Sequence, residues 1–263
     1  MLLAKSCDTR NNIKNGTIKL GTLYEYRETE IEEIADREEG MLTFHLKFTG
    51  QVKVPAIWFN TLAGGSMVFG KETFTRFPGV LRAHFDTVNI VVFDGQDVVL
   101  RDSRATICRE SPNSFVFCMS LVRKMRDSEG IFAGYDDCWY MTAAKAQRFG
   151  LVLGQVLLQF VKAEHLKGNF IVPKETDVTK LKVFVEHRSV DYISREIEIF
   201  DDAHTPLDVF MNKMQSMAFI KPDSYSPELE YRFNYTMVVD GKIVQPQVKK
   251  VILKSEQLLD LVV

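Results

Sequence analysis

Hydrophobic and polar residues alternate along many short segments of the chain, which is the pattern of half-buried β-strands. The longest alternation covers residues 41–59 and is interrupted at Thr49-Gly50, so it predicts a hairpin. A second hairpin is predicted around Asp94-Gly95, and a third at the end of the chain, where 228–238 and 248–253 flank Asp240-Gly241. Similar patterns predict further strands at 17–23, 88–93, 98–100, 115–122, 182–193 and 195–200.

A helical period appears most clearly over 142–165, where apolar residues recur every three and four positions. This pattern predicts a long helix that faces a core. Gly150 and Gly154 each cost such a helix about 1 kcal/mol relative to Ala, which indicates a kink or a close packing contact. A second helix is predicted over 206–219, with Pro206 in its first turn and a Met-rich face. The acidic segment 24–39 predicts a short solvated helix or an ordered loop.

Strands therefore dominate both ends of the chain, and they do not alternate regularly with helices. This order predicts an α+β fold, with a mixed, largely antiparallel sheet, one long packed helix and shorter helices. No internal repeat, low-complexity stretch or extended linker interrupts the pattern. We therefore expect residues 1–263 to form a single α+β domain.

Charge composition narrows the classes of partner. The 33 basic and 35 acidic residues nearly cancel, so the broad positive field of a non-specific nucleic-acid binder is missing. Nucleic acid stays open as a partner only through a local basic cluster near aromatic residues. That cluster consists of Arg76, Arg82, Arg101, Arg104 and Arg109.

Targeting and metal signals are weak. No apolar run is long enough to cross a bilayer, and the first residues lack the apolar region of a secretory signal, so we expect a cytoplasmic protein without membrane contact. The four cysteines contain no C-x-x-C pair, which predicts reduced thiols. The common nucleotide, hydrolase and zinc-protease fingerprints are absent. Asp201-Asp202-Ala203-His204 is explained by a polar turn, and no metal is predicted.

The most distinctive candidate chemistry lies near the C-terminus. Glu228 and Glu230 are two residues apart, so on a strand both carboxylates would point to the same face, about 7 Å apart. Such a pair can divide the work between polarising a sugar hydroxyl and orienting a nucleophile. The competing interpretation is a solvated strand face with basic partners on the neighbouring strand.

The layout of these motifs resembles an uncharacterised family of bacterial and phage cytoplasmic proteins, known only as a domain of unknown function. The resemblance lies in 16–27, in Phe115 to Ser120, in Gly134-Tyr135-Asp136, and in a final Lys-Pro-x-x-Tyr stretch that leads to Glu228-Leu229-Glu230-Tyr231-Arg232. This resemblance implies no function of its own.

A second resemblance does imply one. Arginine-directed ADP-ribosyltransferases carry an early Arg, a middle strand with serine and a late E-x-E, and this chain is similar in having Arg27, Ser120 and Glu228/Glu230 in that order. The resemblance implies NAD as substrate and a macromolecular target, which we expect to be a protein, in a conflict between phage and bacterium. Glu230, Glu228 and Ser120 would be catalytic. Arg27 would grip the pyrophosphate, and Tyr24 or Tyr26 would stack on nicotinamide.

Two other functions compete with this one. A non-catalytic inhibitor or adaptor protein would bind its partner through an exposed apolar patch, for which the face of Met211, Met214 and Met217 is the candidate. A metal-dependent nuclease would use strand carboxylates such as Asp94 or Glu186. The sequence does not indicate an oligomeric state.

Overall fold

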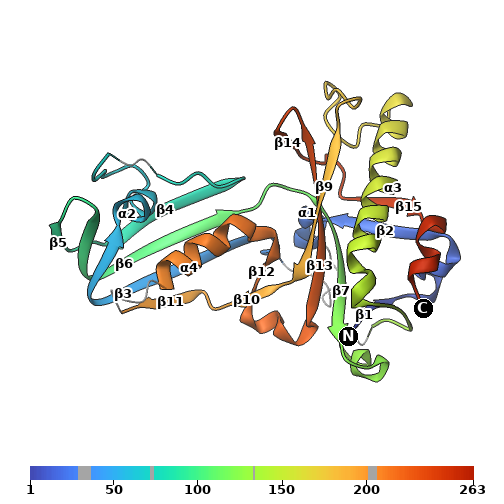
Figure 1. The fold of residues 1–263 in the computed structure, drawn as a ribbon, viewed down its shortest axis with the longest axis horizontal. Coiled ribbons are helices and arrows are strands. Elements are labelled where there is room, and N and C mark those ends of the chain that lie inside the picture. The colour runs from blue at the N-terminus through green and yellow to red at the C-terminus, as the bar shows by residue number, and fades with distance from the viewer. Residues whose placement is uncertain (29–36, 72–73, 133, 201–205) are drawn as a thin grey trace. The chain divides into compact units, whose positions relative to one another are not determined.

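The computed structural model describes residues 1–28, 37–71, 74–132, 134–200 and 206–263, and the chain divides into two compact units (Figure 1). Unit 1 comprises Met1–Glu39, Asn113–Asp191 and Ser224–Val263, and unit 2 comprises Gly40–Pro112 and Tyr192–Asp223. Each unit therefore contains segments that are far apart in the sequence. The sequence analysis predicted a single domain and did not predict these two units.

Unit 1 is built on an eight-stranded sheet in which every pair of neighbouring strands is antiparallel. Its strands are β1 (Leu2–Cys7), β2 (Thr17–Thr22), β7 (Phe115–Val122), β8 (Asp137–Thr142), β9 (Lys182–Ser189), β13 (Glu230–Val239), β14 (Lys242–Val244) and β15 (Lys250–Lys254). The main path runs β14-β13-β7-β1-β8. The predicted strands at 17–23 and 115–122 are confirmed as β2 and β7.

The sheet of unit 1 divides at β7. One edge of β7 pairs with β13 over residues 115–120. Its other edge pairs with β1 at residues 120–122 and with β2 at residues 115 and 116. Residues 117–119 therefore lie where β1 and β2 separate.

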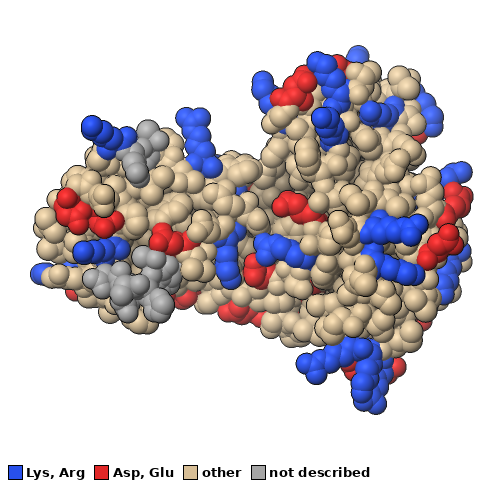
Figure 2. All heavy atoms as spheres, viewed as in Figure 1, with Lys and Arg blue, Asp and Glu red and all other residues tan. Residues whose placement is uncertain are grey.

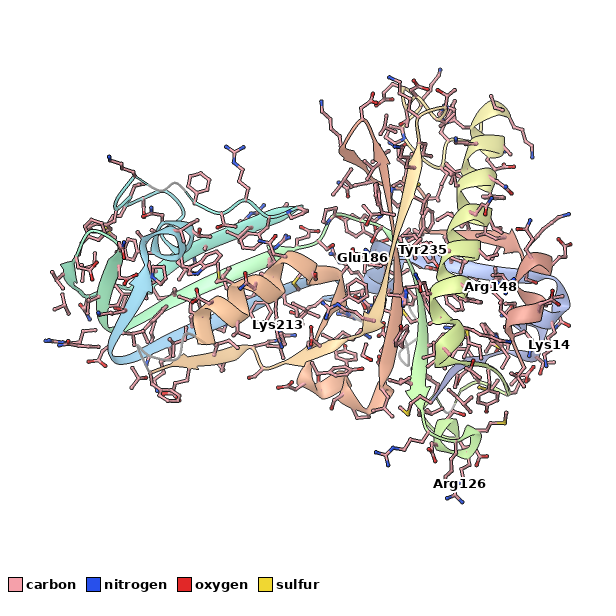
Figure 3. All side chains as sticks on the ribbon, viewed as in Figure 1. Lys14, Arg126, Arg148, Glu186, Lys213 and Tyr235 are labelled. Carbon is pink, nitrogen blue, oxygen red and sulfur yellow. The ribbon has the colours of Figure 1, made fainter. Side chains whose placement is uncertain are left out.

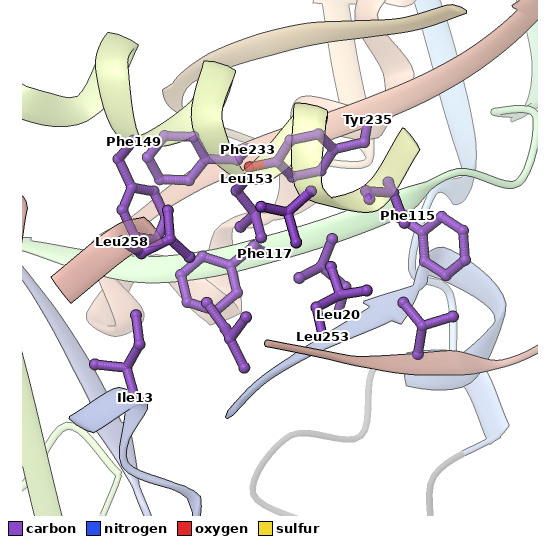
Figure 4. Close-up of a cluster of buried hydrophobic side chains, with 14 of the residues drawn as sticks. Ile13, Leu20, Phe115, Phe117, Phe149, Leu153, Phe233, Tyr235, Leu253 and Leu258 are labelled. Atoms are coloured by element: carbon purple, nitrogen blue, oxygen red, sulfur yellow. The ribbon is translucent and has the colours of Figure 1, made fainter. Parts of the chain in front are cut away.

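One face of this sheet is covered by the long helix α3 (Ala146–Leu166), which confirms the helix predicted over 142–165. Figure 4 shows its side chains packing with those of β7 and β13. A Cβ atom on Gly154 would lie 2.8 Å from Cγ2 of Val185, and one on Gly150 would lie 3.0 Å from Cδ1 of Phe233. The predicted close packing contact is thus present, and the two glycines allow the helix to approach β9 and β13.

Short helices complete unit 1. They are α1 (Leu23–Glu28) and the 3₁₀ segments η1 (Thr9–Asn11), η2 (Ile13–Asn15), η3 (Met125–Ser128), η4 (Ala143–Lys145), η6 (Asp223–Glu228) and η7 (Glu256–Leu261). The acidic segment 24–39 was predicted as a helix or an ordered loop. Its beginning belongs to α1, and its residues 29–36 lie outside the described residues.

Unit 2 contains a five-stranded sheet in the order β11-β3-β6-β4, with β5 also paired to β6. Its strands are β3 (Met41–Pro55), β4 (Val80–Thr87), β5 (Ile90–Phe93), β6 (Asp97–Glu110) and β11 (Glu196–Ile199), and only β11 with β3 is a parallel pair. Residues 41–59 do not form the predicted hairpin. Gly50, with φ of 71°, is absorbed in an irregularity of one long strand that pairs with β6, and the next helix begins at Ala56.

The core of unit 2 lies between this sheet and the helical segments α2 (Ala56–Leu62), α4 (Pro206–Lys213) and η5 (Met214–Phe219). Met211, Met214 and Met217 are at most 1% exposed there. The prediction of an exposed Met face is therefore wrong, because this face is the inner side of the helix that covers the sheet. Two short strands, β10 (Asp191–Ile193) and β12 (Ile220–Pro222), form a separate small sheet.

These elements confirm the predicted α+β class, with largely antiparallel sheets, one long helix and several shorter ones. Basic and acidic side chains are interspersed on the face shown in Figure 2, as the near-zero net charge suggests. Within the part of the chain that the structure describes, no helix has the length and apolar character to span a membrane.

Candidate functional site

The predicted catalytic residues Glu230 and Ser120 lie directly opposite each other, on β13 and β7 of unit 1. The neighbouring pair of the same register on this face joins Arg232 and Cys118. Phe233, which alternates with Arg232, points instead into the core beneath α3. Glu230 and Ser120 are each 5% exposed, so the sheet carries a buried polar cluster on the face opposite its hydrophobic core.

Arg232 is the centre of this cluster. Its Nε donates to Oε1 of Glu230 at 2.6 Å. Its two terminal nitrogens donate to the two carboxylate oxygens of Glu39, at 2.6 and 2.9 Å, in a bidentate pair. All three side chains are nearly inaccessible to water. The arrangement therefore places one guanidinium between two carboxylates in a site of low dielectric constant.

The charge on Arg232 is secured by these partners. Burial alone would lower the pKa of its guanidinium, but Glu230 and Glu39 outweigh burial and raise the pKa above its usual value. The same interactions hold Glu230 in a fixed orientation. Sequence reasoning missed Arg232 and Glu39. Arg232 could have been found, because it is two residues from Glu230 and so shares its face of the strand.

The predicted cofactor-binding residues lie on α1, which contributes to the same cluster. Nε of Arg27 donates to the backbone carbonyl of Glu39 at 2.5 Å, and the Arg27 guanidinium lies 4.4 Å from the ring centroid of Tyr24. A Cβ atom on Gly21 would be 3.1 Å from the ring of Tyr26. Since Gly21 pairs with Val116 of β7, a glycine at this position gives α1 room beside the sheet.

Tyr26 and Glu230 influence each other electrostatically. Burial is the main reason that the pKa of Tyr26 lies well above its usual value, and the negative charges of Glu25 and Glu230 add to the shift. The phenol therefore stays protonated and can act as a hydrogen-bond donor.

Lys5 and Cys118 add two further perturbed groups where β1 and β2 separate. Burial lowers the pKa of Lys5, whose Nζ lies 5.2 Å from the ring centroid of Phe117, and the charge of Glu230 opposes that shift. Burial followed by the Glu230 charge raises the pKa of Cys118, so Cys118 remains a thiol at neutral pH. Such a concentration of perturbed titratable groups is typical of functional sites.

Glu228 is placed differently from its prediction. It is the last residue of η6, and β13 begins only at Glu230. Leu229 between them has a positive φ of 49°, which turns the chain. The prediction that both carboxylates lie on one strand face is therefore wrong, and Glu230 alone belongs to the buried cluster.

One member of the basic cluster predicted from sequence is buried. Arg109 is 1% exposed and donates hydrogen bonds to backbone carbonyls, among them those of Met214 and Val80. Arg109 is therefore a structural residue and not a nucleic-acid contact. The other four members are exposed on unit 2.

The carboxylates named for a nuclease lie in different units. Asp94 accepts hydrogen bonds from the backbone of Gln96 and Asp97 in the turn between β5 and β6, and these bonds lower the pKa of Asp94. Glu186 is on β9 of unit 1, opposite Asn234 of β13 (Figure 3). Among the described residues, no three His, Cys, Asp or Glu side chains are grouped to hold a metal ion. Residues 201–204, the other metal candidate, lie outside the described ranges.

The chain was compared with protein-family models, with curated proteins and with solved structures, and none of them matches it.

Proposed function

We propose that this protein is an ADP-ribosyltransferase-like enzyme, which uses NAD to modify a macromolecular target with Glu230 as its catalytic carboxylate. The observation that supports the proposal is the convergence of four distant segments on one polar cluster: α1 with Tyr26 and Arg27, Glu39, Ser120 on β7, and Glu230 on β13. A solvated strand face would have no reason to gather these groups in a buried position.

In this proposal each residue has a separate role. Glu230 accepts a hydrogen bond from the ribose 2′-hydroxyl, which stabilises the oxocarbenium-like centre as the bond between C1′ and nicotinamide breaks. A nucleophile of the target then bonds to C1′ and loses its proton. Ser120 orients Glu230, Arg27 binds the pyrophosphate, and Tyr24 or Tyr26 stacks on nicotinamide. Arg232 keeps the carboxylate ionised and in place.

The burial of Glu230 imposes a condition on this chemistry. With only 5% of the residue exposed, NAD reaches the carboxylate only after α1 moves away from the sheet. The contact between Arg27 and the Glu39 carbonyl would then be exchanged for a contact with the pyrophosphate. We therefore expect NAD to change amide hydrogen exchange in 23–28, a motion of the kind that gates many enzyme sites.

The decisive variant is Glu230→Gln, which keeps the shape of the side chain and an oxygen that can accept from Arg232. We expect NAD-dependent labelling of a target to fall on the order of 100-fold, since one preorganised electrostatic contact to the transition state is lost. Labelling would be followed with biotin-tagged NAD, and folding with circular dichroism. Glu256→Gln, an exposed position in η7, is the matched control and should keep full labelling.

Calorimetric titration with NAD tests the first step separately. Saturable binding that weakens in Arg27→Gln supports the proposed pyrophosphate contact. A wild-type protein that shows no heat of binding with NAD, or a Glu230→Gln variant that labels as well as wild type, contradicts the proposed function.

A further inference from the structure

The sheet of unit 2 has one face that the described helices leave uncovered. Along β3 the buried residues Phe44, Leu46 and Phe48 point toward the helices, and the alternating residues point the other way. On this second face lies a hollow of about 410 Å³. Its lining consists of His45, Leu46, Lys47, Asp86, Arg104, Ala105 and Glu196.

A chain of hydrogen bonds fixes the state of His45 at this hollow. The hydroxyl of Thr106 donates to Oδ2 of Asp86 at 2.9 Å, since an ionised carboxylate can only accept. The single hydroxyl hydrogen is then used, so the 3.2 Å bond between Thr106 Oγ1 and Nδ1 of His45 has the histidine as donor. In neutral His45 the proton is on Nδ1, and Nε2 is left as a hydrogen-bond acceptor.

Two of the charges at the hollow are already paired. Nζ of Lys47 lies 3.0 Å from Oε1 of Glu198, a residue of β11. Oδ1 of Asp86 lies 3.1 Å from Nε2 of His84. Lys47 and Asp86 are therefore each engaged with a neighbouring side chain.

The remaining two charged groups, Arg104 and Glu196, have opposite charges and lie apart from each other. The side chains of Arg104 and Glu196 line the hollow, yet neither has an ion pair or hydrogen bond with any described residue. The register places Glu196 beside His45 and Arg104 beside Lys47, with β3 between their strands. From strand spacing, their Cα atoms are about 12 Å apart. A ligand therefore meets a carboxylate at one end of the hollow, a guanidinium at the other, and His45 between them.

We propose that this hollow is a binding site for a small zwitterion of the amino-acid or dipeptide class. Its ammonium group lies at Glu196, its carboxylate at Arg104, and an N–H group donates to Nε2 of His45. Glu196 would repel a purely anionic ligand, and Arg104 would repel a purely cationic one. This site lies in the other unit from Glu230 and does not depend on NAD, so each proposal can fail independently.

Glycylglycine is the probe, and its capped forms separate the two charges. Binding would be followed by chemical-shift changes of the protein amides. We expect saturable shifts at His45 and Lys47, with affinity about threefold weaker when the probe is N-acetylated and about threefold weaker when it is amidated, because exposed charge pairs are individually weak. Equal affinity for all three forms, or no saturation in the millimolar range, overturns the proposal.

Variants assign each charge to its end of the hollow. Glu196→Gln should remove the preference for a free ammonium group, and Arg104→Gln should remove the preference for a free carboxylate. Arg82→Gln, an exposed arginine on β4 that does not line the hollow, is the matched control and should leave both preferences intact. An Arg104→Gln variant that still prefers the free carboxylate also overturns the proposal.

Discussion

Each unit of this protein buries an arginine, and the two are stabilised in different ways. In unit 1, Arg232 is held by the carboxylates of Glu230 and Glu39. In unit 2, Arg109 is held by backbone carbonyls, including those of Pro78 and Glu110, and its guanidinium lies 5.3 Å from the ring centroid of Phe77. One cation is therefore balanced by two directly bonded carboxylates. The other is held by carbonyl dipoles and a π face, and the charge of Glu110 only partly offsets its burial.

The difference appears in the ionisation of the two groups. Burial lowers the pKa of Arg109 to about 10, which still leaves it charged at neutral pH. The carboxylates reverse this effect at Arg232 and raise its pKa. An arginine bound to carbonyl groups connects segments of backbone. An arginine between two carboxylates keeps those carboxylates ionised and fixes their orientation. The second arrangement can serve chemistry, and the first serves the fold.

The largest expected effect that tests this comparison is the loss of the Arg232 guanidinium. Arg232→Met leaves two buried carboxylates without their cation, which should lower the free energy of unfolding of unit 1 by about 3–5 kcal/mol. The chain has two tryptophans, Trp58 in unit 2 and Trp139 in unit 1. In a Trp58→Phe background, urea unfolding followed by Trp139 fluorescence therefore reports on unit 1.

Lys180→Met is the control for this measurement. Nζ of Lys180 lies 3.1 Å from Oδ2 of Asp240, and both side chains are exposed. Its loss should destabilise unit 1 far less than Arg232→Met does, because an exposed ion pair is weak. If Arg232→Met were no more destabilising than this, the buried carboxylates would not be held as charged groups, and the comparison would fail.

A smaller effect is expected when Arg109 is replaced by Met. The variant leaves carbonyl groups such as those of Met214 and Val80 without a donor, but it leaves no buried charge. We expect a loss of about 2–3 kcal/mol, in the range for unsatisfied buried polar groups. In a Trp139→Phe background, Trp58 reports on unit 2. A loss that equals or exceeds that of Arg232→Met would contradict the distinction drawn between the two sites.

The sequence predicted these two arginines poorly for a physical reason. Alternation within a segment shows which residues share a strand face, but it does not show which strand lies beside it. Arg109 was therefore assigned to an exposed basic cluster, and Arg232 was named only as the end of a motif and given no role. The terminal hairpin shows the same limit: β14 completes it at Asp240-Gly241, whereas the strand predicted next to it is β15 and pairs with β2.

Local signals were more successful. The long helix, its close contact at Gly154 and the strands at 17–23 and 115–122 depend on periodicity and glycine size, which the sequence contains. Five strands were missed: β1, β4, β8, β12 and β14. The chain crosses between units at residues 39/40, 112/113, 191/192 and 223/224 without an extended linker, so composition gave no sign of two units. The nearness of Ser120 and Glu230 followed only from a resemblance in motif order.

The smallest expected effect concerns His187, a partly buried side chain on β9. His187 stacks on Phe233 and shares a 2.7 Å hydrogen bond between its Nδ1 and the Tyr231 hydroxyl, and burial lowers its pKa below 6.5. The unfolded chain therefore takes up a proton first as the pH falls, so stability is fully present above about pH 6.5 and decreases below it.

His187→Gln removes this group, and unit 1 should lose less stability between about pH 7.5 and 5.5 than wild type does. Urea midpoints followed by Trp139 at both pH values measure the difference, in which the contributions of the other histidines cancel. An unchanged or steeper pH dependence in the variant would show that His187 is already solvated in the folded state.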